Sequence, residues 1–286
     1  MAGPILVVSP HLDDAVLSLG GSIAGWVARG TRVVIASVYT QGPPLADIAP
    51  SMRKFADYTT RIAEDDAACE VLGAEVLRLR QIERAFRRPY LTGWSFFTTP
   101  AERTGFGGLT NVIAALEPLA AVDPAEIHVP FGIGNHIDHV EALLAASDWA
   151  IARGWLARLR FYEDFYALSF GIRRTHFQAK RLAAHRPWQK PLLRARRLAV
   201  ILKTIGARIA GPPVEMFLAP ALARAEWTST SAPVSASAEQ QQLAAIACYR
   251  SQTRAFGGLA GVDRALRAYH ALFRGEPCWR PEVRSP

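Results

Sequence analysis

The chain has 286 residues, of which 50% are hydrophobic, and a formal net charge of +8 at pH 7. This length predicts one domain with a sizeable core, and the lack of any apolar run of about 18 residues argues against a membrane-spanning helix. The surplus arginines are spread along the chain without a nucleic-acid-binding motif, so we expect no nucleic-acid partner.

Short apolar runs alternate with longer amphipathic segments over the range 4–166. Such apolar runs predict buried strands, and the longer periodic segments predict helices. Their alternation predicts an α/β fold with a mostly parallel sheet, right-handed crossovers and helices on both faces. The expected strands are 4–9, 32–39, 75–80, 126–131 and 158–166, and the expected helices are 15–29, 60–72, 108–121 and one from about residue 137.

Two stretches lack this regularity. Residues 81–106 are rich in arginine and aromatic residues and have no clean period, which predicts a long loop, and long loops in compact domains are often functional. Residues 167–286 are expected to form a helical and irregular extension of a single domain, whose core spans about 4–166. In this extension we expect a basic amphipathic helix over 192–210, a Ser/Thr/Ala-rich loop over 228–238 and a last helix over 239–256.

The basic segment 192–210 has two interpretations. It either covers the core with its arginines in water, which we favour, or contacts a membrane surface. The three cysteines are far apart, so they predict neither a disulfide framework nor a Cys-x-x-Cys metal site. Together with an N-terminus that does not resemble a signal peptide, they favour a cytoplasmic location.

Residues that can bind a metal cluster at the ends of two expected strands. His11, Asp13 and Asp14 follow the first strand, and His136, Asp138 and His139 follow the fourth. Ligands of an open parallel sheet bind beyond the carboxyl ends of its strands, so both groups meet if these two strands are neighbours. Either group alone reads equally well as helix caps or surface residues. Their matching positions favour a functional site.

The chemistry of these side chains is specific. Imidazole nitrogens and carboxylate oxygens bind zinc at about 2.0–2.2 Å, and three such ligands leave a position open for water. The metal lowers the pKa of that water toward about 7. A further carboxylate can then accept a proton, and a further imidazole can protonate a leaving group or stabilise an oxyanion. The pattern therefore predicts a metal-dependent hydrolase.

Two weaker signals lie in the expected loop. Glu83 follows the third strand and either meets the substrate or is an exposed loop acid. The aromatic residues of the loop either form a wall for a large or lipid-bearing substrate or pack against the body of the protein, which we favour slightly. These residues are Tyr90, Trp94, Phe96 and Phe97.

At the two clusters the sequence resembles the PIG-L/LmbE-like family of zinc-dependent N-deacetylases. Pro10-His11-Leu12-Asp13-Asp14 matches the first family signature, A/P-H-x-D-D-E, up to its last position, where Ala15 replaces the acid. His136-Ile137-Asp138-His139 matches the second signature, H-x-D-H, fully. Arg61 to Gly73 resembles the R-x-x-E…LG helix of the family, and Tyr249-Arg250-Ser251-Gln252 resembles its Y-x-S-Q segment.

The resemblance implies a Rossmann-like sheet, the hydrolysis of an acetamide on an amino sugar, and a role for each motif residue. Zinc, or another divalent metal, would be held by His11, Asp14 and His139. Asp13 would be the general base, His136 would stabilise the tetrahedral intermediate or protonate the amine, Asp138 would orient a histidine, and Arg61 would bind sugar hydroxyls. Ala15 removes a carboxylate that the family has behind the metal ligands.

We therefore predict a zinc-dependent hydrolase that removes an N-acetyl or related N-acyl group from a small-molecule amino sugar or glycoside. Two alternatives stay open: a metal-dependent amidase for a non-sugar natural-product amide, and a non-catalytic binding protein on the same fold. The intact set of acids and histidines argues against the latter, because a site that had lost catalysis need not keep Asp13.

Overall fold

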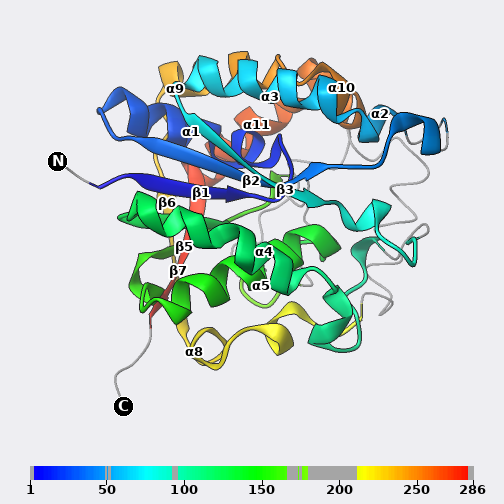
Figure 1. The fold of residues 1–286 in the computed structure, drawn as a ribbon. Helices are drawn as coiled ribbons and strands as arrows, with labels where there is room; N and C mark the ends of the chain where they lie inside the picture. The colour runs from blue at the N-terminus through cyan, green and yellow to red at the C-terminus, as the bar shows by residue number, and fades with distance from the viewer. Residues whose placement is uncertain are drawn as a thin grey trace.

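The computed structural model of the protein describes residues 3–48, 50, 53–91, 96–165, 173, 176–179 and 211–282. Within these residues, seven strands form one sheet in the order β3-β2-β1-β4-β5-β7-β6 (Figure 1). The strands are β1 (Ile5–Ser9), β2 (Val33–Gln41), β3 (Glu75–Ile82), β4 (Glu126–Pro130), β5 (Leu159–Tyr162), β6 (Glu226–Ala232) and β7 (Glu276–Glu282).

The first five strands are parallel. At one side β7 pairs antiparallel with β5, and β6 pairs antiparallel with β7, so β7 alone runs against the other strands of the described sheet. The predicted α/β class with a mostly parallel sheet is confirmed. Val7 of β1 is in register with Ile35 of β2 and with His128 of β4, so β1 and β4 are neighbours as expected. The strand order reverses between them, which is where an open α/β sheet binds its ligand.

Helices cover both faces of the sheet. Figure 1 shows α1, α3, α9 and α11 on one face and α4 and α5 on the other. Every helix that the structure describes is too short or too polar to reach across a lipid bilayer. The α-helices are α1 (Asp14–Ala28), α2 (Arg53–Ala56), α3 (Tyr58–Leu72), α4 (Leu109–Leu116), α5 (Ile137–Ala152), α8 (Pro220–Ala223), α9 (Ala236–Ile246), α10 (Arg250–Thr253) and α11 (Leu259–Phe273). Short 3-10 helices span Leu45–Asp47, Arg84–Phe86, Arg103–Phe106, Glu117–Val122, Leu156–Arg158, Val214–Phe217 and Arg254–Phe256.

The alternation of side chains along β1 explains the two cores. Leu6 and Val8 point into the cluster beneath α4 and α5, whereas Ile5 and Val7 point into the cluster beneath α1, α3, α9 and α11. A strand buried on both faces reads as a continuous apolar run, which is what residues 4–8 show. This double burial fixes β1, so the polar residues that follow it lie in a defined position at the edge of the sheet.

The C-terminal part differs from expectation in three places. The loop expected over 228–238 is wrong, because residues up to Ala232 belong to β6, whose Ser and Thr side chains suit an edge strand. The helix expected over 239–256 is wrong as one unit: α9 ends at Ile246 and a separate turn, α10, begins at Arg250. Helix α11 and strand β7 were not predicted.

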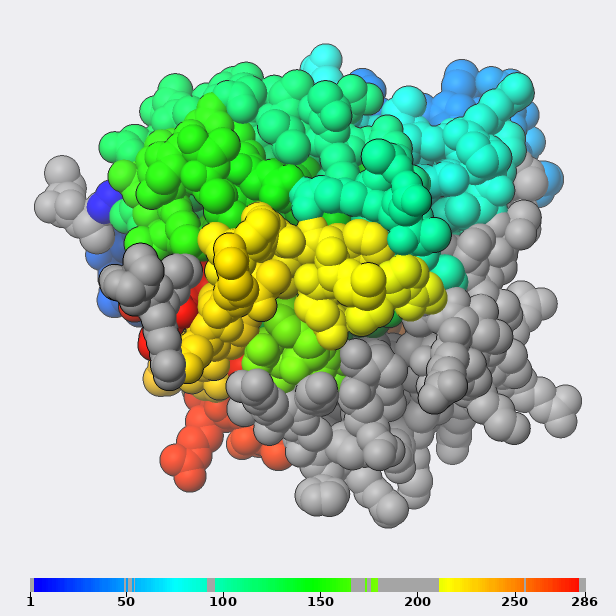
Figure 2. All heavy atoms as spheres, turned by 90° about the horizontal axis from the view of Figure 1, so that it is seen from below, coloured from blue at the N-terminus to red at the C-terminus, as the bar shows by residue number. Residues whose placement is uncertain are grey.

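Other boundaries also move. The fifth strand ends at Tyr162 rather than at residue 166, and part of the loop expected over 81–106 is ordered as short 3-10 helices. Figure 2 shows the segment from Gly211 (yellow) lying along the face that carries α4 and α5, where the rings of Phe106 and Phe217 are 5.3 Å apart. The basic segment expected over 192–210 and the aromatic residue Trp94 lie outside the described residues.

Candidate metal centre

The turn after β1 is closed by hydrogen bonds of Ser9. Its hydroxyl donates to the carbonyl of His11 at 2.6 Å and accepts from the backbone N–H of Ala15 at 3.0 Å. Asp13 stands directly before helix α1, but its side chain makes no capping hydrogen bond to that helix. The interpretation of Asp13 as a simple helix cap is therefore not what the structure shows.

The turn after β4 brings the second motif to the same edge of the sheet. Gly134 and Asn135 have positive φ values of 91° and 58°, a left-handed conformation that glycine and asparagine adopt most easily. This bend delivers His136 to the start of α5, followed by Asp138 and His139 in its first turn.

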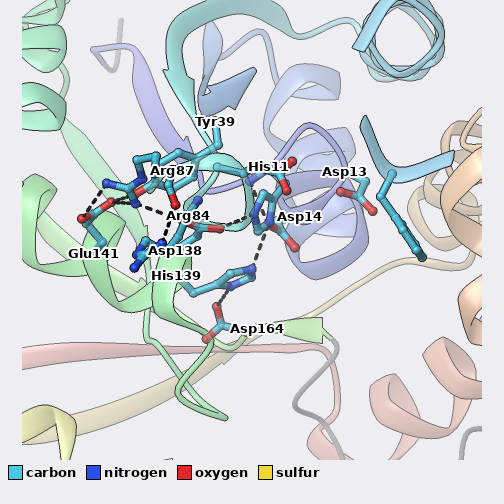
Figure 3. A network of polar contacts seen from close by, with 12 residues as sticks. His11, Asp13, Asp14, Tyr39, Arg84, Arg87, Asp138, His139, Glu141 and Asp164 are labelled. Atoms are coloured by element: carbon cyan, nitrogen blue, oxygen red, sulfur yellow. Dashed lines mark hydrogen bonds and ion pairs between the residues drawn. The ribbon is translucent and has the colours of Figure 1, made fainter. Parts of the chain in front are cut away.

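The two motifs meet around Asp14, as Figure 3 shows. Its Oδ2 lies 3.0 Å from Nδ1 of His11 and 3.1 Å from Nε2 of His139. Ligand atoms bound tetrahedrally at about 2.0–2.2 Å from one zinc ion are about 3.3–3.6 Å apart, and each of these two contacts is a few tenths of an ångström shorter than that spacing. Among the described residues, two groups bring one ligand atom of each member within 4.8 Å of the others: His11, His136 and His139, and His11, Glu83 and Asp138. The predicted set with Asp14 is neither of these groups, and it stays a prediction.

Two buried carboxylates lie behind the histidines. Asp138 Oδ2 is 3.4 Å from Nε2 of His11, and Asp164 Oδ1 is 2.6 Å from Nδ1 of His139. Such outer carboxylates fix the tautomer and orientation of a metal-binding imidazole. Asp164 was not predicted. It closely follows β5, on the same edge as both motifs, and its position after a strand was the signal that could have revealed it.

The charges of the site favour a cation. Burial lowers the pKa of both histidines, but neighbouring carboxylates outweigh it: Glu83, Asp138 and Asp14 raise the pKa of His11 well above its usual value. Asp14 and Asp164 raise the pKa of His139 to about 9. The pocket thus stabilises positive charge on the two rings, and a divalent ion would supply that charge in place of the protons.

The pKa values of Asp13 and His136 are shifted in opposite directions. Burial and the nearby Asp14 carboxylate raise the pKa of Asp13. Burial and the nearby His139 lower the pKa of His136 to about 3, so this imidazole is neutral at pH 7. Phe97 from the expected aromatic loop packs against His136 with the ring centroids 5.4 Å apart, a contact that fits both interpretations of this loop.

Arg61 and Glu83 lie beside Asp13. Arg61 Nη1 donates to Glu83 Oε1 at 2.7 Å, and its Nη2 is 3.8 Å from Asp13 Oδ1. Tyr58 also donates to Glu83, at 2.5 Å. Glu83 is 9% exposed, so the interpretation as an exposed loop acid is wrong. The structure therefore brings all eight predicted site residues into one neighbourhood at the edge formed by β1, β3 and β4.

Residues 6–150, just over half of the chain, match the model of the PIG-L family, which is described as GlcNAc-PI de-N-acetylase. The chain belongs to the PIG-L family. The resemblance seen in the two motifs is thereby confirmed, and the predicted enzyme class, an N-deacetylase of amino sugars, is that of the family. No curated protein sequence matches the chain significantly.

Solved structures support the fold of this PIG-L protein along its whole length. The deacetylase Dbv21, which acts on the A40926 pseudoaglycone, is 20% identical, with 100% of both chains covered and a TM-score of 0.65. A deacetylase of teicoplanin biosynthesis is 20% identical, with 99% of this chain and 98% of that chain covered and a TM-score of 0.67. The zinc-inhibited form of the teicoplanin deacetylase Orf2 is 18% identical, with 99% of this chain and 98% of that chain covered and a TM-score of 0.64. At sequence identities of 18–20%, the similarity to these structures establishes a shared fold only.

Proposed function

We propose that this PIG-L protein hydrolyses the N-acetyl, or a related N-acyl, amide of an amino sugar or glycoside, with zinc or another divalent ion held by His11, Asp14 and His139. The observation that carries the proposal is the position of Asp14 Oδ2, within 3.1 Å of a nitrogen of both imidazoles. When bound, the metal supplies a Lewis acid that polarises the amide carbonyl and acidifies water.

Asp13 would act as the general base. Its buried carboxyl group has a raised pKa, which makes it a better proton acceptor than an exposed aspartate. It would take a proton from the attacking water and, once protonated, donate that proton to the departing amine nitrogen. Arg61, 3.8 Å away, would hold the carboxylate in place between these two steps.

His136 would donate a hydrogen bond to the oxygen of the amide as charge develops there. Of the two roles that the family resemblance leaves open, this one suits a neutral imidazole, because a ring whose pKa is about 3 carries no spare proton at pH 7. Asp138 would orient His11, which its Oδ2 approaches at 3.4 Å.

The sugar would lie over the pair formed by Arg61 and Glu83. Both side chains are buried and each can exchange hydrogen bonds with hydroxyl groups, which an aliphatic amide lacks. The names of the family and of its structural neighbours point the same way, because they describe a GlcNAc-PI de-N-acetylase, a deacetylase of the A40926 pseudoaglycone and a deacetylase of teicoplanin biosynthesis.

The test is acetate release from a panel of free, lipid-linked and glycopeptide-borne N-acetyl amino sugars and non-sugar acetamides. The enzyme is loaded with a single equivalent of metal, because one neighbour is a zinc-inhibited form. We expect release from at least one sugar. Release only from non-sugar acetamides would favour the amidase alternative, and metal binding without any release would favour a binding protein.

Asp13→Ala separates catalysis from metal binding. We expect kcat to fall about 10²–10⁴-fold, the usual contribution of a general base, while the metal content of the purified protein is unchanged. Asp47→Ala, at an exposed aspartate of a short 3-10 helix, is the control and should keep full activity. Loss of metal in Asp13→Ala would contradict the assigned role.

A further inference from the structure

The Tyr249–Gln252 segment reaches the active site from the far end of the chain. Tyr249 stands in the break between α9 and α10, with only 1% of its surface exposed. Its hydroxyl lies 2.8 Å from Asp65 Oδ1 and 3.1 Å from the carbonyl oxygen of Leu12. Leu12 stands between His11 and Asp13, so this hydroxyl contacts the turn that carries three of the site residues.

The carbonyl groups of this turn show why the contact matters. The carbonyl of Pro10 accepts from the backbone N–H of Tyr39, that of His11 from Ser9, and that of Asp13 from the N–H of Leu17. These three partners belong to β2, β1 and α1, whereas the carbonyl of Leu12 accepts from Tyr249, far along the chain. Buried carbonyl groups need a partner, so the C-terminal segment completes the hydrogen bonding of the turn.

The same segment holds helix α3. Ser251 donates twice to Glu64, from its backbone N–H at 2.9 Å and from its hydroxyl at 2.6 Å. Glu64 and Asp65 follow Arg61 by three and four residues, close to one helical turn, so bonds to them fix the rotation of α3 at Arg61. Figure 1 shows α10 beside α3 on the same face of the sheet.

We propose that Tyr249 and Ser251 are positioning residues of the active site. Tyr249 holds the turn of His11, Asp13 and Asp14 through Leu12, and Ser251 holds Arg61 through Glu64 and helix α3. The inference rests on the proposed function for the meaning of these site residues. It predicts that two neighbouring residues affect different kinetic constants, which a general loss of stability would not do.

The first experiment measures the metal dissociation constant of Tyr249→Phe by competition of zinc with a chelator, together with kcat. Loss of one hydrogen bond to the turn should weaken zinc binding and lower kcat, each by about five-fold. Zinc binding and kcat equal to those of the wild type would overturn the role of Tyr249.

Asp65→Asn gives a second route to the same answer if Tyr249→Phe does not fold. The hydroxyl of Tyr249 then no longer shares its proton with a carboxylate and remains free to donate to Leu12. Zinc binding in this variant should therefore be at least as tight as in the wild type. Weaker zinc binding would contradict the role of Tyr249, because its hydrogen bond to Leu12 would then not hold the turn without Asp65.

The second experiment tests Ser251→Ala, with Ser235→Ala as the control. Ser235 caps α9 by accepting from the N–H of Ala238 at 3.1 Å, so its loss also destabilises the C-terminal part without touching α3. We expect Ser251→Ala to raise KM about five-fold with unchanged zinc binding, and Ser235→Ala to leave both unchanged. Equal KM values in the two variants would overturn the role of Ser251. A wild-type protein without zinc binding or activity would instead overturn the proposed function.

Discussion

Asp164 shows how a residue outside both motifs shapes the site. Its Oδ1 bonds to Nδ1 of His139, and its Oδ2 accepts from the backbone N–H of Ile133 at 2.9 Å. The carboxylate therefore ties the turn after β4 to the ring that faces Asp14. Because this bond directs Nε2 of His139 toward Asp14 Oδ2, where we propose that the metal binds, we expect Asp164 to affect metal affinity although it is not a ligand in our proposal.

Asp164→Asn should weaken metal binding about 10–100-fold, because outer-sphere partners of metal-binding histidines typically contribute that much. The measurement is a zinc titration against a chelator, with folding checked by far-UV circular dichroism. Asp148→Asn is the matched control, since Asp148 also lies on the α5 side of the sheet but pairs with Arg103. Equal affinities in the two variants would contradict the role of Asp164.

The motifs predicted seven of the eight residues that lie together, and the place of Glu83 after the third strand predicted the eighth, whereas Asp164 was not predicted. His11 and His139 stand out because a buried strand does not normally end in imidazoles and carboxylates. Asp164 lies in the run 158–166, where the aromatic residues Phe161, Tyr162 and Phe165 suggested that the strand continued. The strand in fact ends at Tyr162, which places Asp164 at the edge of the sheet.

Asp65 links protonation to stability. Burial raises the pKa of Asp65 to about 7, although the hydrogen bond from Tyr249 lowers it. Between about pH 4 and pH 7, the folded carboxyl group keeps a proton that the unfolded chain releases, so this group makes stability fall as the pH rises. Asp65→Asn, which cannot titrate, should remove this dependence. Urea unfolding of both proteins at several pH values should show slopes that differ by up to about 1.4 kcal/mol per pH unit in that window. An unfolding free energy with the same pH dependence in both proteins would contradict this role of Asp65.

At the scale of elements, helix α1 is bound to the C-terminal part through its own backbone. Gln242 of α9 donates to the carbonyls of Val16 and Leu17, and Glu276 of β7 accepts from the N–H groups of Gly21 and Ser22. Side chains that bond to a helix backbone in this way require a close approach. The glycines of α1 allow it, because a Cβ atom on Gly20 would lie 2.5 Å from Cγ of Gln242.

Replacing a helix glycine with alanine usually stabilises a protein, but this packing reverses the effect at Gly20. Gly25→Ala should stabilise the protein by about 0.5–1 kcal/mol, since its Cβ would meet only the flexible tip of Arg29 at 3.4 Å. Gly20→Ala should destabilise it by about 1–3 kcal/mol, because Gln242 must move. The free energy of unfolding in urea measures both. Stabilisation by Gly20→Ala would show that α9 does not press against α1 at this position.

Sequence periodicity did not predict the two C-terminal strands, β6 and β7. The run Glu226–Ala232 contains one large apolar residue, Trp227, so it lacks the apolar alternation that marks a strand. Strand β7 contains Pro277 and Pro281, which normally argue against a central strand. Both prolines lie outside the two residues, Cys278 and Trp279, that pair with β5. Pairing with a distant partner, rather than local propensity, determines these strands.

At the scale of the whole molecule, the C-terminal part is a component of the core rather than an appendage. Trp279 of β7 is in register with Phe161 of β5, and the ring of Trp227 packs 4.9 Å from that of Phe161. On the other face, α9 and α11 contribute Ile246, Val262 and other buried residues to the cluster around α1. We therefore propose that the chain folds as one unit, although both motifs that we propose to bind the metal precede β5.

A fragment that ends at Phe165 tests this proposal. It keeps all eight predicted site residues and also Asp164, but loses the strands that cover Phe161 and the helices that cover α1. Exposure of these apolar faces costs about 25 cal/mol for each Å² of buried apolar area that is lost, and α1 also loses its bonds to Gln242 and Glu276. We expect no cooperative urea transition and no zinc binding from the fragment, whereas the full chain shows both. A fragment that unfolds cooperatively and binds zinc as the full chain does would show that the part of the chain up to Phe165 forms an independent domain.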